Sequence, residues 1–389
     1  MEHISRTDKF KDIQKTKDNY DILVTAPGRI NLIGEHTDYN GGLVLPGAVN
    51  KTIKLYLRKN NTLQSNFYSK NIEEGFSCEM DYFIPQKTMW RNFVLGVLDQ
   101  ILRNRRKPLP GFDCYIESDL PAGSGLSSSA ALECGLATGV NALFELGYSD
   151  WEIIKLSQRA EHEFVGTKCG IMDQFAVVKG ERDKLIYLNC ETLESQMIPV
   201  DFGPYSLVLL NTNVSHQLAD SEYNKRTNQC REALGILNQK KSSYPTLASI
   251  PKARLLRFKN KMDPELFGIA KYVIEENHRV KSTVKKLRKS RLKDVGKLIY
   301  ESHEGLQHLF RVSCTELDFL VDFTRELDYV IGSRMMGGGF GGCTLSLVKT
   351  SELELFLDTI SSAYRKEFDL DLTPLVVSIH PGIQTKTKQ

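Results

Sequence analysis

The spacing of apolar and polar residues in the first 210 positions predicts a mixture of strands and helices. Short alternating or apolar runs are typical of strands, and they occur at residues 23–25, 44–45, 52–57, 112–116, 185–188 and 207–210. Four-residue apolar repeats predict helices at residues 89–102, from about 127 to 144, and at 150–165. Pro108 and Pro110 are expected to close the first helix, and Asp150 is placed to cap the third.

The second half of the chain is mostly helical in pattern. Helices are predicted at residues 216–237, 264–327 and 352–368, and strands at residues 343–348 and 375–379, followed by a polar tail. The first twenty residues are polar and alternate in charge, as in a helix or a loose arm. Both halves therefore have α+β character, and we expect two domains, residues 1–200 and residues 201–389.

The bulk composition limits the class of protein without indicating a chemistry. With 389 residues, of which 41% are hydrophobic and 25% charged, the chain has the make-up of a soluble globular protein of about two domains. A formal net charge of +3 argues against nucleic acid as a partner, and the basic run at residues 285–293 is expected to be a solvated helix face. Apolar runs fall short of the ~18 residues of a membrane helix, so no membrane partner is expected.

The N-terminus and the cysteines bear on the compartment. Residues 1–14 lack the apolar core of a signal peptide. The eight cysteines are scattered without a C-x-x-C pair, which fits free thiols in a reducing cytosol better than a disulfide framework. We therefore expect a cytoplasmic protein, and a monomer or a weak oligomer.

The segment LPAGSGLSSSAA at residues 120–131 predicts a phosphate-binding loop between a strand and a helix. Gly123 and Gly125 let backbone N–H groups approach an anion without interference from a Cβ. The helix that begins near Ser127 directs its unpaired N–H groups and the positive end of its dipole to the same place. The serine hydroxyls add donors for phosphate and oxygen ligands for Mg²⁺.

Two other nucleotide-binding loops do not match this segment. A Walker A loop needs a lysine after its second glycine, and none follows Gly125. A dinucleotide fingerprint needs a third glycine where this chain has Ser128, which argues against a nicotinamide-dependent oxidoreductase. Taken alone, the segment is also compatible with an ordinary serine cap after a turn.

Four segments, in order, resemble the motifs of the GHMP kinase family. The phosphate loop resembles the second family motif, and the glycine cluster GGGFGG at residues 337–342 resembles the third. The first motif is more specific, because APGRINLIGEHTDYNGG at residues 26–42 resembles the galactokinase signature throughout its length. CGIMDQF at residues 169–175 is similar to the segment that carries the catalytic aspartate of the family. The resemblance therefore covers nearly the whole chain.

This resemblance implies both a fold and a reaction. The fold would be α+β, with a mixed-sheet N-terminal domain, a C-terminal domain of helices and antiparallel sheet, and the active site in the cleft between them. The reaction would be the ATP-dependent phosphorylation of the anomeric hydroxyl of D-galactose, which gives α-D-galactose 1-phosphate and ADP in the first committed step of galactose catabolism. Galactose and ATP are the implied partners, and Mg²⁺ is the implied cofactor.

A dense polar cluster after the first strand-like stretch is suited to a sugar. Carboxylates and imidazole hydrogen-bond sugar hydroxyls, and such a site discriminates because a missing hydroxyl leaves a buried group unpaired. On its own the cluster would favour a solvated turn. The resemblance assigns galactose binding to Glu35, His36, Asp38, Gly170, Asp173 and Tyr223. Tyr223 rests on the shorter match SEYN at residues 221–224.

The resemblance makes Asp173 the base that takes the anomeric proton, and Arg29 its orienting partner. An aspartate beside a cation stays ionised, and a guanidinium can neutralise charge that develops on the transferred phosphoryl group. A loose transition state needs little activation of the nucleophile, so a positioning role for Asp173 stays open, as does a purely structural ion pair.

The resemblance also assigns the nucleotide and the metal. ATP would contact Trp90, through stacking of adenine on the indole, and the loop residues Gly123, Ser124, Gly125, Leu126, Ser127, Ser128 and Ser129. Mg²⁺ would be held by Ser129 and Glu161, with phosphates and waters completing its shell. Glu163 lies two residues further on and is the alternative carboxylate.

Two related functions stay open at this point. A kinase for N-acetylgalactosamine or arabinose would use the same scaffold, although the intact signature favours galactose. A regulator that binds galactose and ATP without catalysis belongs to a different class, and such relatives lack part of the Ser-Ala segment that is complete here at residues 127–131. Because Asp173 and Arg29 are also present, we expect an enzyme.

Overall fold

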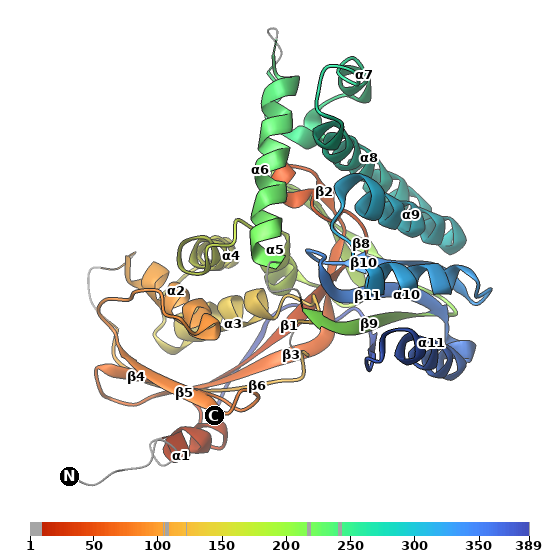
Figure 1. The fold of residues 1–389 in the computed structure, drawn as a ribbon. Helices are drawn as coiled ribbons and strands as arrows, with labels where there is room; N and C mark the ends of the chain where they lie inside the picture. The colour runs from red at the N-terminus through yellow and green to blue at the C-terminus, as the bar shows by residue number, and fades with distance from the viewer. Residues whose placement is uncertain are drawn as a thin grey trace.

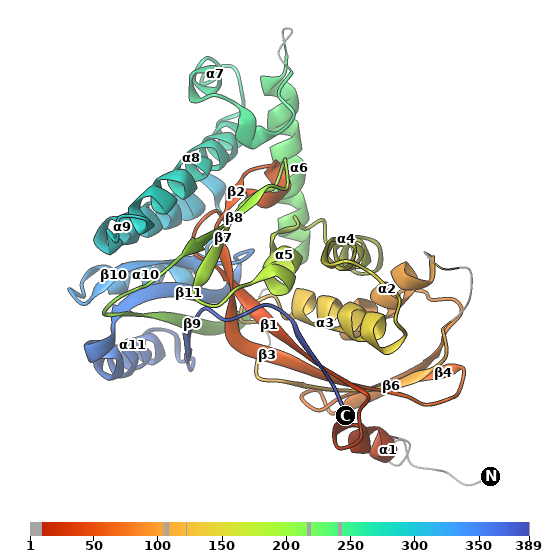
Figure 2. The ribbon, with the colours of Figure 1, turned by 180° about the vertical axis from the view of Figure 1, so that it is seen from behind.

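The computed structural model describes residues 10–388, apart from residues 104, 106–108, 122, 216–218 and 240–242. Pro108, the predicted helix start at residue 216 and residues 1–9 of the predicted N-terminal arm therefore lie outside the described residues. Figures 1 and 2 show two layered parts side by side, one built on a long twisted sheet near both termini and the other on a smaller sheet between helices.

The described strands form three sheets, with the orders β13-β1-β3-β6-β4-β5, β10-β11-β9-β12 and β2-β7-β8. The pairing of β4 with β6 is parallel and the pairings of β1 with β3 and β13 are antiparallel, so the six-stranded sheet is mixed. The bounds are β1 Ile22–Asn31, β2 Leu43–Val44, β3 Pro46–Lys59, β4 Gln64–Ser69, β5 Glu74–Glu79, β6 Phe112–Ser118, β7 Lys184–Asn189, β8 Ser195–Pro199, β9 Tyr205–Ser215, β10 Val330–Met336, β11 Gly341–Lys349, β12 Thr373–Val377 and β13 Gln384–Thr387.

The helices cover the sheets and fill the space between them (Figure 1). The α-helices are α1 Lys11–Gln14, α2 Met89–Arg103, α3 Ser128–Leu143, α4 Asp150–Ala160, α5 Met172–Lys179, α6 Ala219–Leu237, α7 Lys252–Leu256, α8 Pro264–Leu287, α9 Leu292–Glu304, α10 Thr315–Arg325 and α11 Leu353–Phe368. The π-helical turns are Glu161–Val165 and Gly305–Phe310, and the 3₁₀ turns are Lys15–Lys17, Asp38–Asn40, Leu247–Ser249 and Thr350–Glu352.

Helix α3 lies against β1 and β3, and this contact fixes the loop that precedes it. The helix approaches the sheet through two glycines on one face. A Cβ at Gly135 would come within 2.8 Å of Leu55, and one at Gly139 within 2.7 Å of Leu57. Real Cβ atoms do not approach other heavy atoms that closely, so the glycines set the depth of the helix. The start of α3 is therefore held at a defined height above the end of β6.

The four-stranded sheet shows the period-two burial of a sheet covered on both faces. Leu207 and Leu209 of β9 belong to the same hydrophobic cluster as Ile299 of α9. Val208 and Leu210 belong to a separate cluster with residues of α10 and α11. Alternate apolar side chains of β9 thus pack against α9 on one face of the sheet and against α10 and α11 on the other.

The C-terminal half is tied to the N-terminal sheet at two places. The last strand, β13, pairs with β1, so that Thr385 lies opposite Val24 (Figure 2). Arg334 of β10 is fully buried and donates to the carbonyl oxygens of Leu32, at 3.0 Å, and Asn31. The hydrogen bonds of Arg334 place β10 directly beside the end of β1 and the segment that follows it.

Most of the predicted helices and strands are confirmed, with three corrections. The third predicted helix is capped by the hydroxyl of Ser149 in a capping box with Glu152 rather than by Asp150, and it continues after Ala160 as a π-helical turn. The predicted helical stretch at residues 264–327 divides into α8, α9 and α10. The polar tail is in part a strand, because main-chain pairing with β1 needs no apolar side chains.

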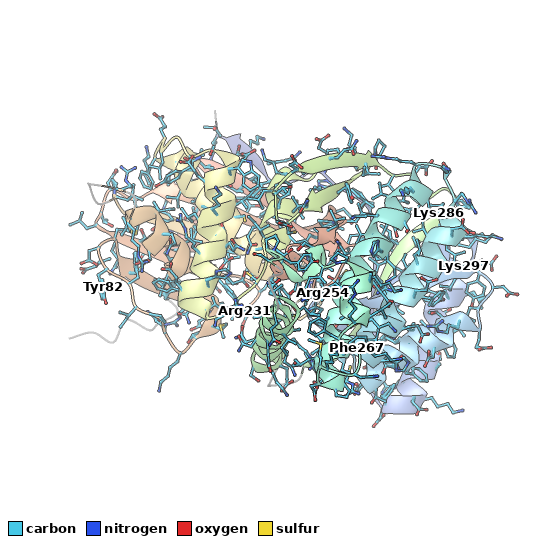
Figure 3. The ribbon with its side chains drawn as sticks, turned by 90° about the horizontal axis from the view of Figure 1, so that it is seen from above. Tyr82, Arg231, Arg254, Phe267, Lys286 and Lys297 are labelled. Carbon is cyan, nitrogen blue, oxygen red and sulfur yellow. The ribbon has the colours of Figure 1, made fainter. Side chains whose placement is uncertain are left out.

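Other sequence-based expectations can be compared with this fold. Among the described residues, no helix is long and apolar enough to cross a membrane. All eight cysteines are free thiols. The basic run at residues 285–293 spans the end of α8 and the start of α9, and its lysine and arginine side chains are exposed or half-buried. Figure 3 shows Lys286 and Lys297 on these two helices, and Lys286 pairs with Asp294 at 3.2 Å, so a solvated helix face is confirmed.

Candidate active site

Arg29 and Asp173 form a two-pronged ion pair at the centre of the site. Arg29 is on β1, and its Nε and Nη2 atoms donate to the two carboxylate oxygens of Asp173, each at 2.7 Å. Asp173 lies in the first turn of α5 and also accepts from the hydroxyl of Ser127. The remaining guanidinium nitrogen, Nη1, donates to the carbonyl oxygen of Gly125. Burial opposes the charge of Arg29, but Asp173 and Glu35 outweigh it and raise the pKa of the guanidinium. The guanidinium therefore stays charged, and its hydrogen bonds join strand, helix and loop.

Two cavities meet at this ion pair. The smaller has a volume of about 120 Å³ and the larger about 390 Å³, and Arg29, Asp173, Gly337 and Gly338 line both. The smaller cavity is also lined by Glu35, His36, Asp38, Glu161, Thr167, Cys169, Met172 and Tyr223. The larger one is lined by the loop and the first residues of α3, by Val214 and Met336, and by the glycine cluster at residues 337–342. Elements from both halves of the chain thus enclose each cavity.

Glu35 links the polar segment after β1 to the glycine cluster. One of its carboxylate oxygens accepts from Nη2 of Arg334 at 3.0 Å and from the N–H of Gly337 at 2.9 Å, and the other accepts from Asn31 at 3.0 Å. Burial of the carboxyl opposes ionisation, yet the charges of Arg334 and Arg29 hold its pKa below the ordinary value. Glu35 is therefore a buried carboxylate whose position is fixed from three sides.

His36 presents a neutral imidazole to the smaller cavity. Its backbone is in the left-handed region, with a φ of 58°, a conformation that non-glycine residues adopt mainly where surrounding structure imposes it. Nδ1 lies 2.8 Å from the hydroxyl of Tyr39. Nε2 is buried and has no hydrogen-bond partner among the described residues. Because burial lowers the pKa of His36 to about 4, the ring is uncharged at neutral pH. A ligand hydroxyl could satisfy the orphaned nitrogen.

Asp38 lies on the wall of the smaller cavity. Burial, together with the charge of Asp173, raises the pKa of Asp38 to about 7. Gly170 packs directly against this carboxylate, since a Cβ at Gly170 would overlap its oxygens. Tyr223 of α6 closes the same cavity, and its ring centroid lies 5.5 Å from that of His36. The structure thus brings five of the six predicted sugar-binding residues to one small polar cavity, and the sixth, Gly170, packs against Asp38.

The loop before α3 has the backbone expected of an anion-binding loop. Gly123 and Gly125 have φ values of 69° and 67°, and Ser127 has 53°. Ser127 is the residue before α3, where a capping side chain would lie. Its hydroxyl makes no capping hydrogen bond with the described residues and donates to Asp173 instead. The interpretation of this serine as an ordinary helix cap is therefore wrong. The start of the helix is left free to face the larger cavity.

The side chains of the loop divide into those that face the cavity and those that hold the loop. Ser124 donates to the carbonyl oxygen of Pro121 at 2.7 Å, and Leu126 is 1% exposed and packs in the main core. Leu126 therefore offers the cavity only its backbone. Gly342 of the glycine cluster approaches the loop closely, because a Cβ there would lie 3.4 Å from the carbonyl oxygen of Gly123. The backbones of the cluster and of the loop therefore pack close together at this point.

Glu161 lies beside Ser129 at the join of the two cavities. Its carboxyl is on the π-helical turn and accepts from the amide of Gln174 at 2.9 Å and from the thiol of Cys169 at 3.4 Å. Burial and the charge of Asp173 raise the pKa of Glu161 to about 7, while hydrogen bonds, including one with Ser129, oppose this shift. Two hard oxygen donors on neighbouring helices could thus take part in holding a divalent cation.

Glu163 has a different environment. It is exposed, and its carboxylate accepts from Gln100 at 3.0 Å and from Arg103 at 2.5 Å. Both partners are on α2, on the side away from Ser129. The described residues contain no group of three or more His, Cys, Asp or Glu side chains that could hold a metal ion by themselves. A cation at Glu161 and Ser129 would therefore need further ligands from the substrate and from water.

Trp90 lies apart from the residues that surround the ion pair. It is in the first turn of α2, where its Nε1 donates to Glu74 at 2.9 Å and its ring packs edge-on against Phe76 at 5.1 Å. It is not among the described residues that line the larger cavity. The stacking of adenine on Trp90 stays a prediction.

Sequence reasoning missed Arg334 and Asn31, which hold Glu35. Arg334 is 299 residues from its carboxylate partner, so no local pattern links the two residues. The role of Ser127 as a donor to Asp173 was also missed, because the two residues are 46 positions apart. A charged residue inside an otherwise apolar strand is the signal that could have drawn attention to Arg334.

Comparison with known proteins agrees with this geometry. Residues 92–181 of the chain match the family described as the GHMP kinases N terminal domain. Residues 283–366 match the family described as GHMP kinases C terminal. It also matches the galactokinase galactose-binding signature over residues 8–59. It is 42% identical to galactokinase from Clostridium tetani, covering 92% of this chain and 90% of the relative. It is 38% identical to galactokinase from Thermotoga neapolitana, covering 93% of this chain and 99% of that one.

Solved structures show the same likeness. The crystal structure of Lactococcus lactis galactokinase complexed with galactose superposes with a TM-score of 0.90 at 32% identity, covering 97% of this chain and 98% of that one. Mevalonate kinase from Methanococcus jannaschii, at 18% identity and a TM-score of 0.62 over 92% of this chain and 98% of its own, shares the fold. With four family motifs around one ion pair and relatives alike over nearly their full length, this chain belongs to the galactokinases of the GHMP kinase family.

Proposed function

We propose that this chain transfers the γ-phosphoryl group of ATP to the anomeric hydroxyl of D-galactose, giving α-D-galactose 1-phosphate and ADP. The observation that carries the proposal is that the Arg29–Asp173 pair lines both the small polar cavity and the cavity of the phosphate loop. A hydroxyl bound in the first and a phosphate bound in the second would meet at the same two side chains. The galactose-binding signature and the galactose-bound relative support the identity of the sugar.

Galactose would be held by Glu35, His36, Asp38, Gly170, Asp173 and Tyr223. His36 is suited to this because its neutral imidazole has an unsatisfied Nε2. The Asp38 carboxyl lies near a second carboxylate, and the charge of Arg29 only partly offsets burial and this repulsion, so hydrogen bonds from sugar hydroxyls would stabilise its ionised form. A sugar that places one hydroxyl differently would leave such buried groups unpaired, which is the basis of discrimination.

Asp173 would accept the proton of the anomeric hydroxyl as the oxygen forms its bond to the γ-phosphorus and the bond to the ADP oxygen breaks. Arg29 fixes the two carboxylate oxygens and keeps the aspartate oriented. The same guanidinium would offset charge on the transferred phosphoryl group. Because the transition state of phosphoryl transfer is loose, electrostatic positioning by this pair would supply much of the rate enhancement.

ATP would place its phosphates in the larger cavity, against the backbone of Gly123, Ser124, Gly125 and Leu126 and the start of α3 at Ser127, Ser128 and Ser129. The left-handed glycines and the free helix start support this placement. Adenine would stack on Trp90, whose ring is half-buried near the start of α2.

Ser129 and Glu161 would hold Mg²⁺. They fit the ion because both offer hard oxygens, and because Glu161 is a buried carboxyl whose raised pKa reflects burial and a neighbouring carboxylate. Glu163 is engaged by α2, which favours Glu161 over it. When bound, the ion supplies positive charge that neutralises the β- and γ-phosphates. The protein side chains orient it, and phosphates and waters would complete its shell.

The test is a panel of monosaccharides assayed for ADP release with ATP and Mg²⁺, and for the product by phosphorus NMR. We expect galactose to be converted to the 1-phosphate, and glucose, which differs at the C4 hydroxyl, to be much poorer in kcat/KM. Comparable kcat/KM values for glucose and galactose would overturn the assignment of the sugar. Better use of N-acetylgalactosamine or arabinose would establish the related sugar kinases instead, and binding without turnover would establish the non-catalytic regulator.

Three further expectations belong with this proposal. The free thiols of all eight cysteines support a reducing, cytoplasmic environment. The chain is proposed to act as a monomer or a weak oligomer, which sedimentation would test. The division into residues 1–200 and 201–389 is also proposed. Strand β13 is assigned to the N-terminal unit, because it pairs with β1.

A further inference from the structure

A helix from the other half of the chain binds the segment that carries three of the proposed galactose-binding residues. This segment, the sugar loop, comprises residues 34–43 and ends at the first residue of β2, which lies beside α8 (Figures 1 and 2). The hydroxyl of Tyr272 on α8 donates to the carbonyl oxygen of Glu35 at 3.0 Å. One turn further along α8, a carboxylate oxygen of Glu276 accepts from the N–H of Gly34 at 2.9 Å. One face of α8 thus holds two backbone groups at the start of the sugar loop.

The other end of the sugar loop is also bound by α8. The side-chain oxygen of Asn277 accepts from the N–H of Leu43 at 2.8 Å, and its amide nitrogen donates to the carbonyl oxygen of Ala248 at 3.2 Å. Between the two ends, the hydroxyl of Thr37 lies 2.8 Å from the carbonyl oxygen of Gly34 and 2.7 Å from that of Leu43. The sugar loop is therefore a compact unit that α8 holds at both ends.

The side chain of Tyr272 is fixed by its packing. It is 0% exposed, and its ring centroid lies 4.8 Å from that of Phe310. A Cβ at Gly305 would come within 2.7 Å of the Tyr272 ring, so the backbone of the π-helical turn packs directly on this ring. The Phe310 ring also lies 4.8 Å from the ring of His36. The packing thus sets the position of the Tyr272 hydroxyl and connects Tyr272 to the sugar loop through a second route.

Glu276 is fixed by hydrogen bonds. It is 0% exposed and accepts from the hydroxyl of Ser302 on α9 at 2.7 Å and from Nε of Arg279 at 2.6 Å. The oxygen that accepts from Ser302 is the same one that accepts from the N–H of Gly34. Helices α8 and α9 together therefore determine where this N–H group lies.

The backbone of the sugar loop needs such support. Gly34 and His36 have φ values of 107° and 58°, and a non-glycine residue keeps such a conformation mainly where surrounding structure imposes it. The carbonyl group that Tyr272 binds belongs to the planar peptide unit that joins Glu35 to His36, so its orientation governs the φ of His36. Tyr272 and Glu276 are not among the described residues that line either cavity. They can therefore affect a bound sugar only through the loop.

We propose that α8 sets the affinity for galactose by positioning the sugar loop, with Tyr272 as the main positioning residue and Glu276 and Asn277 in support. The inference rests on the proposed function, since it takes the smaller cavity as the galactose site. It adds to that function a control of sugar binding by a helix that does not itself form the wall of the site.

The expected consequence is a loss of sugar affinity with little loss of turnover. Without the hydrogen bond from Tyr272, the peptide unit between Glu35 and His36 could rotate, and the unsatisfied Nε2 of His36 would no longer be held toward one place in the cavity. The Arg29–Asp173 pair is held by its own two hydrogen bonds and should act as before.

The test is Tyr272→Phe, which removes one hydroxyl and keeps the buried ring. We expect the dissociation constant of galactose, measured by calorimetry, and KM for galactose to rise about five- to tenfold, as for the loss of one hydrogen bond. The kcat at saturating galactose and KM for ATP should stay within about twofold of the wild-type values, because the lost interaction acts alike on bound substrate and transition state.

Tyr364→Phe is a matched control. Tyr364 is also 0% exposed, and its hydroxyl donates to the carbonyl oxygen of Thr212 in the four-stranded sheet at 2.9 Å. Both variants should lower the melting temperature, but only Tyr272→Phe should raise KM for galactose. Wild-type galactose affinity in a folded Tyr272→Phe protein, or an equal loss of affinity in Tyr364→Phe, would overturn the inference and make the hydrogen bond a purely structural one.

If Tyr272→Phe does not fold, Asn277→Ala decides the question. Asn277 is only half-buried, and its truncation frees the N–H of Leu43 at the other end of the sugar loop. A rise in the dissociation constant of galactose with kcat maintained would support the inference, and an unchanged dissociation constant would overturn it.

The outcome is separable from that of the proposed function. Failure of the wild-type chain to phosphorylate galactose in the monosaccharide panel would reject the function, whatever the variants do. Phosphorylation of galactose by the wild type, with unchanged galactose affinity in Tyr272→Phe, would reject only the role of α8.

Discussion

Asp173 and Asp38 are two carboxylates at the same small cavity with different surroundings. Asp173 is held at both oxygens by the guanidinium of Arg29. Asp38 faces the charge of Asp173 and is buried without such a partner, so its pKa rises to about 7. The two environments suit different tasks. A carboxylate held in place can receive a proton or orient a hydroxyl, whereas a carboxyl with a pKa near 7 is stabilised most in its ionised form by a ligand that hydrogen-bonds to it.

Replacing Asp173 with Asn should lower kcat by about 10²–10⁴-fold, the usual contribution of a general base. Galactose binding should survive in part, since the amide keeps the shape and can still hydrogen-bond. Steady-state kinetics and calorimetry of galactose binding would measure the two effects separately. A near-normal kcat in Asp173→Asn would remove the proposed base and leave positioning by the other groups to carry catalysis.

Arg29→Lys tests the partner of this aspartate. Lysine keeps the charge and loses the planar fork that binds both carboxylate oxygens, so kcat should also fall. Because the two side chains act on one transition state, the effects of Asp173→Asn and Arg29→Lys should be strongly non-additive in the double variant. Simple multiplication of the two losses would mean that the residues act independently.

Asp38→Asn should stabilise the ligand-free protein at pH 8 and have little effect near pH 4. The folded-state pKa of about 7 lies above the ordinary value of 3.8, so the folded state binds the proton more tightly. That contribution is present at low pH and is lost as the pH rises towards 7. Asparagine does not ionise and so escapes this loss, which amounts to about 1.4 kcal/mol for each unit by which the pKa is raised. Melting curves at both pH values would measure this, with the exposed Asp358→Asn as control. A pH-independent difference would contradict it.

At the scale of the element, the loop and α3 act as one unit. Gly135 and Gly139 let the helix lie close to β1 and β3, and the free start of the helix then faces the larger cavity. The backbone of the loop, with its left-handed glycines, turns N–H groups in the same direction. The sheet therefore determines where an anion would bind, and the side chains of the loop contribute little to that placement.

Gly123→Val should weaken ATP binding by an order of magnitude or more while the protein stays folded. Gly123 has a φ of 69° and no atom within 4 Å of an added Cβ in the described structure, so the clash would be with the phosphates themselves. Gly147, with a φ of 76° and the same open surroundings, lies outside the loop and is a matched control for backbone strain. Equal ATP affinities in Gly123→Val and Gly147→Val, measured by calorimetry, would show that the loop does not contact phosphate.

The sequence predicted those elements whose pattern is local. The loop at residues 120–131 and the helix after it could be predicted because glycines, serines and an apolar repeat occur together. Strands β4 and β5 were not predicted, since Phe67 and Phe76 are isolated apolar positions among polar ones. Strand β13 was missed because it is held by main-chain pairing with β1 across the length of the chain. Such pairing leaves no trace in local hydrophobicity.

The candidate site shows the same division. Residues within the four motifs were predicted by resemblance and lie together around Arg29 and Asp173. Arg334 was not, because its partner Glu35 lies 299 residues away, and the supporting contacts of Asn31 and Gln174 were not predicted although both residues lie within the motifs. Supporting residues of this kind have no fixed sequence pattern, and only the packed structure identifies them.

At the scale of the whole molecule, the cleft is held by contacts between the two halves. Arg334 of β10 binds Glu35 and the carbonyl oxygens of Leu32 and Asn31. The same Glu35 binds the N–H of Gly337 at the start of the glycine cluster. One buried network therefore connects the segment after β1, which lines the smaller cavity, to the cluster that lines both. Stability and the geometry of the site are coupled through it.

Arg334→Met should lower the free energy of unfolding by about 3–5 kcal/mol, because it leaves the fully buried carboxylate of Glu35 without its cation. The double variant with Glu35→Gln should recover part of this loss, since the stranded charge is then removed. Arg325→Met breaks an exposed pair with Glu304 and should cost no more than about 1 kcal/mol. Urea unfolding would measure all three variants, and KM for galactose should rise in Arg334→Met as the smaller cavity loosens. Equal losses in Arg334→Met and Arg325→Met would mean that the buried network does not hold the two halves together.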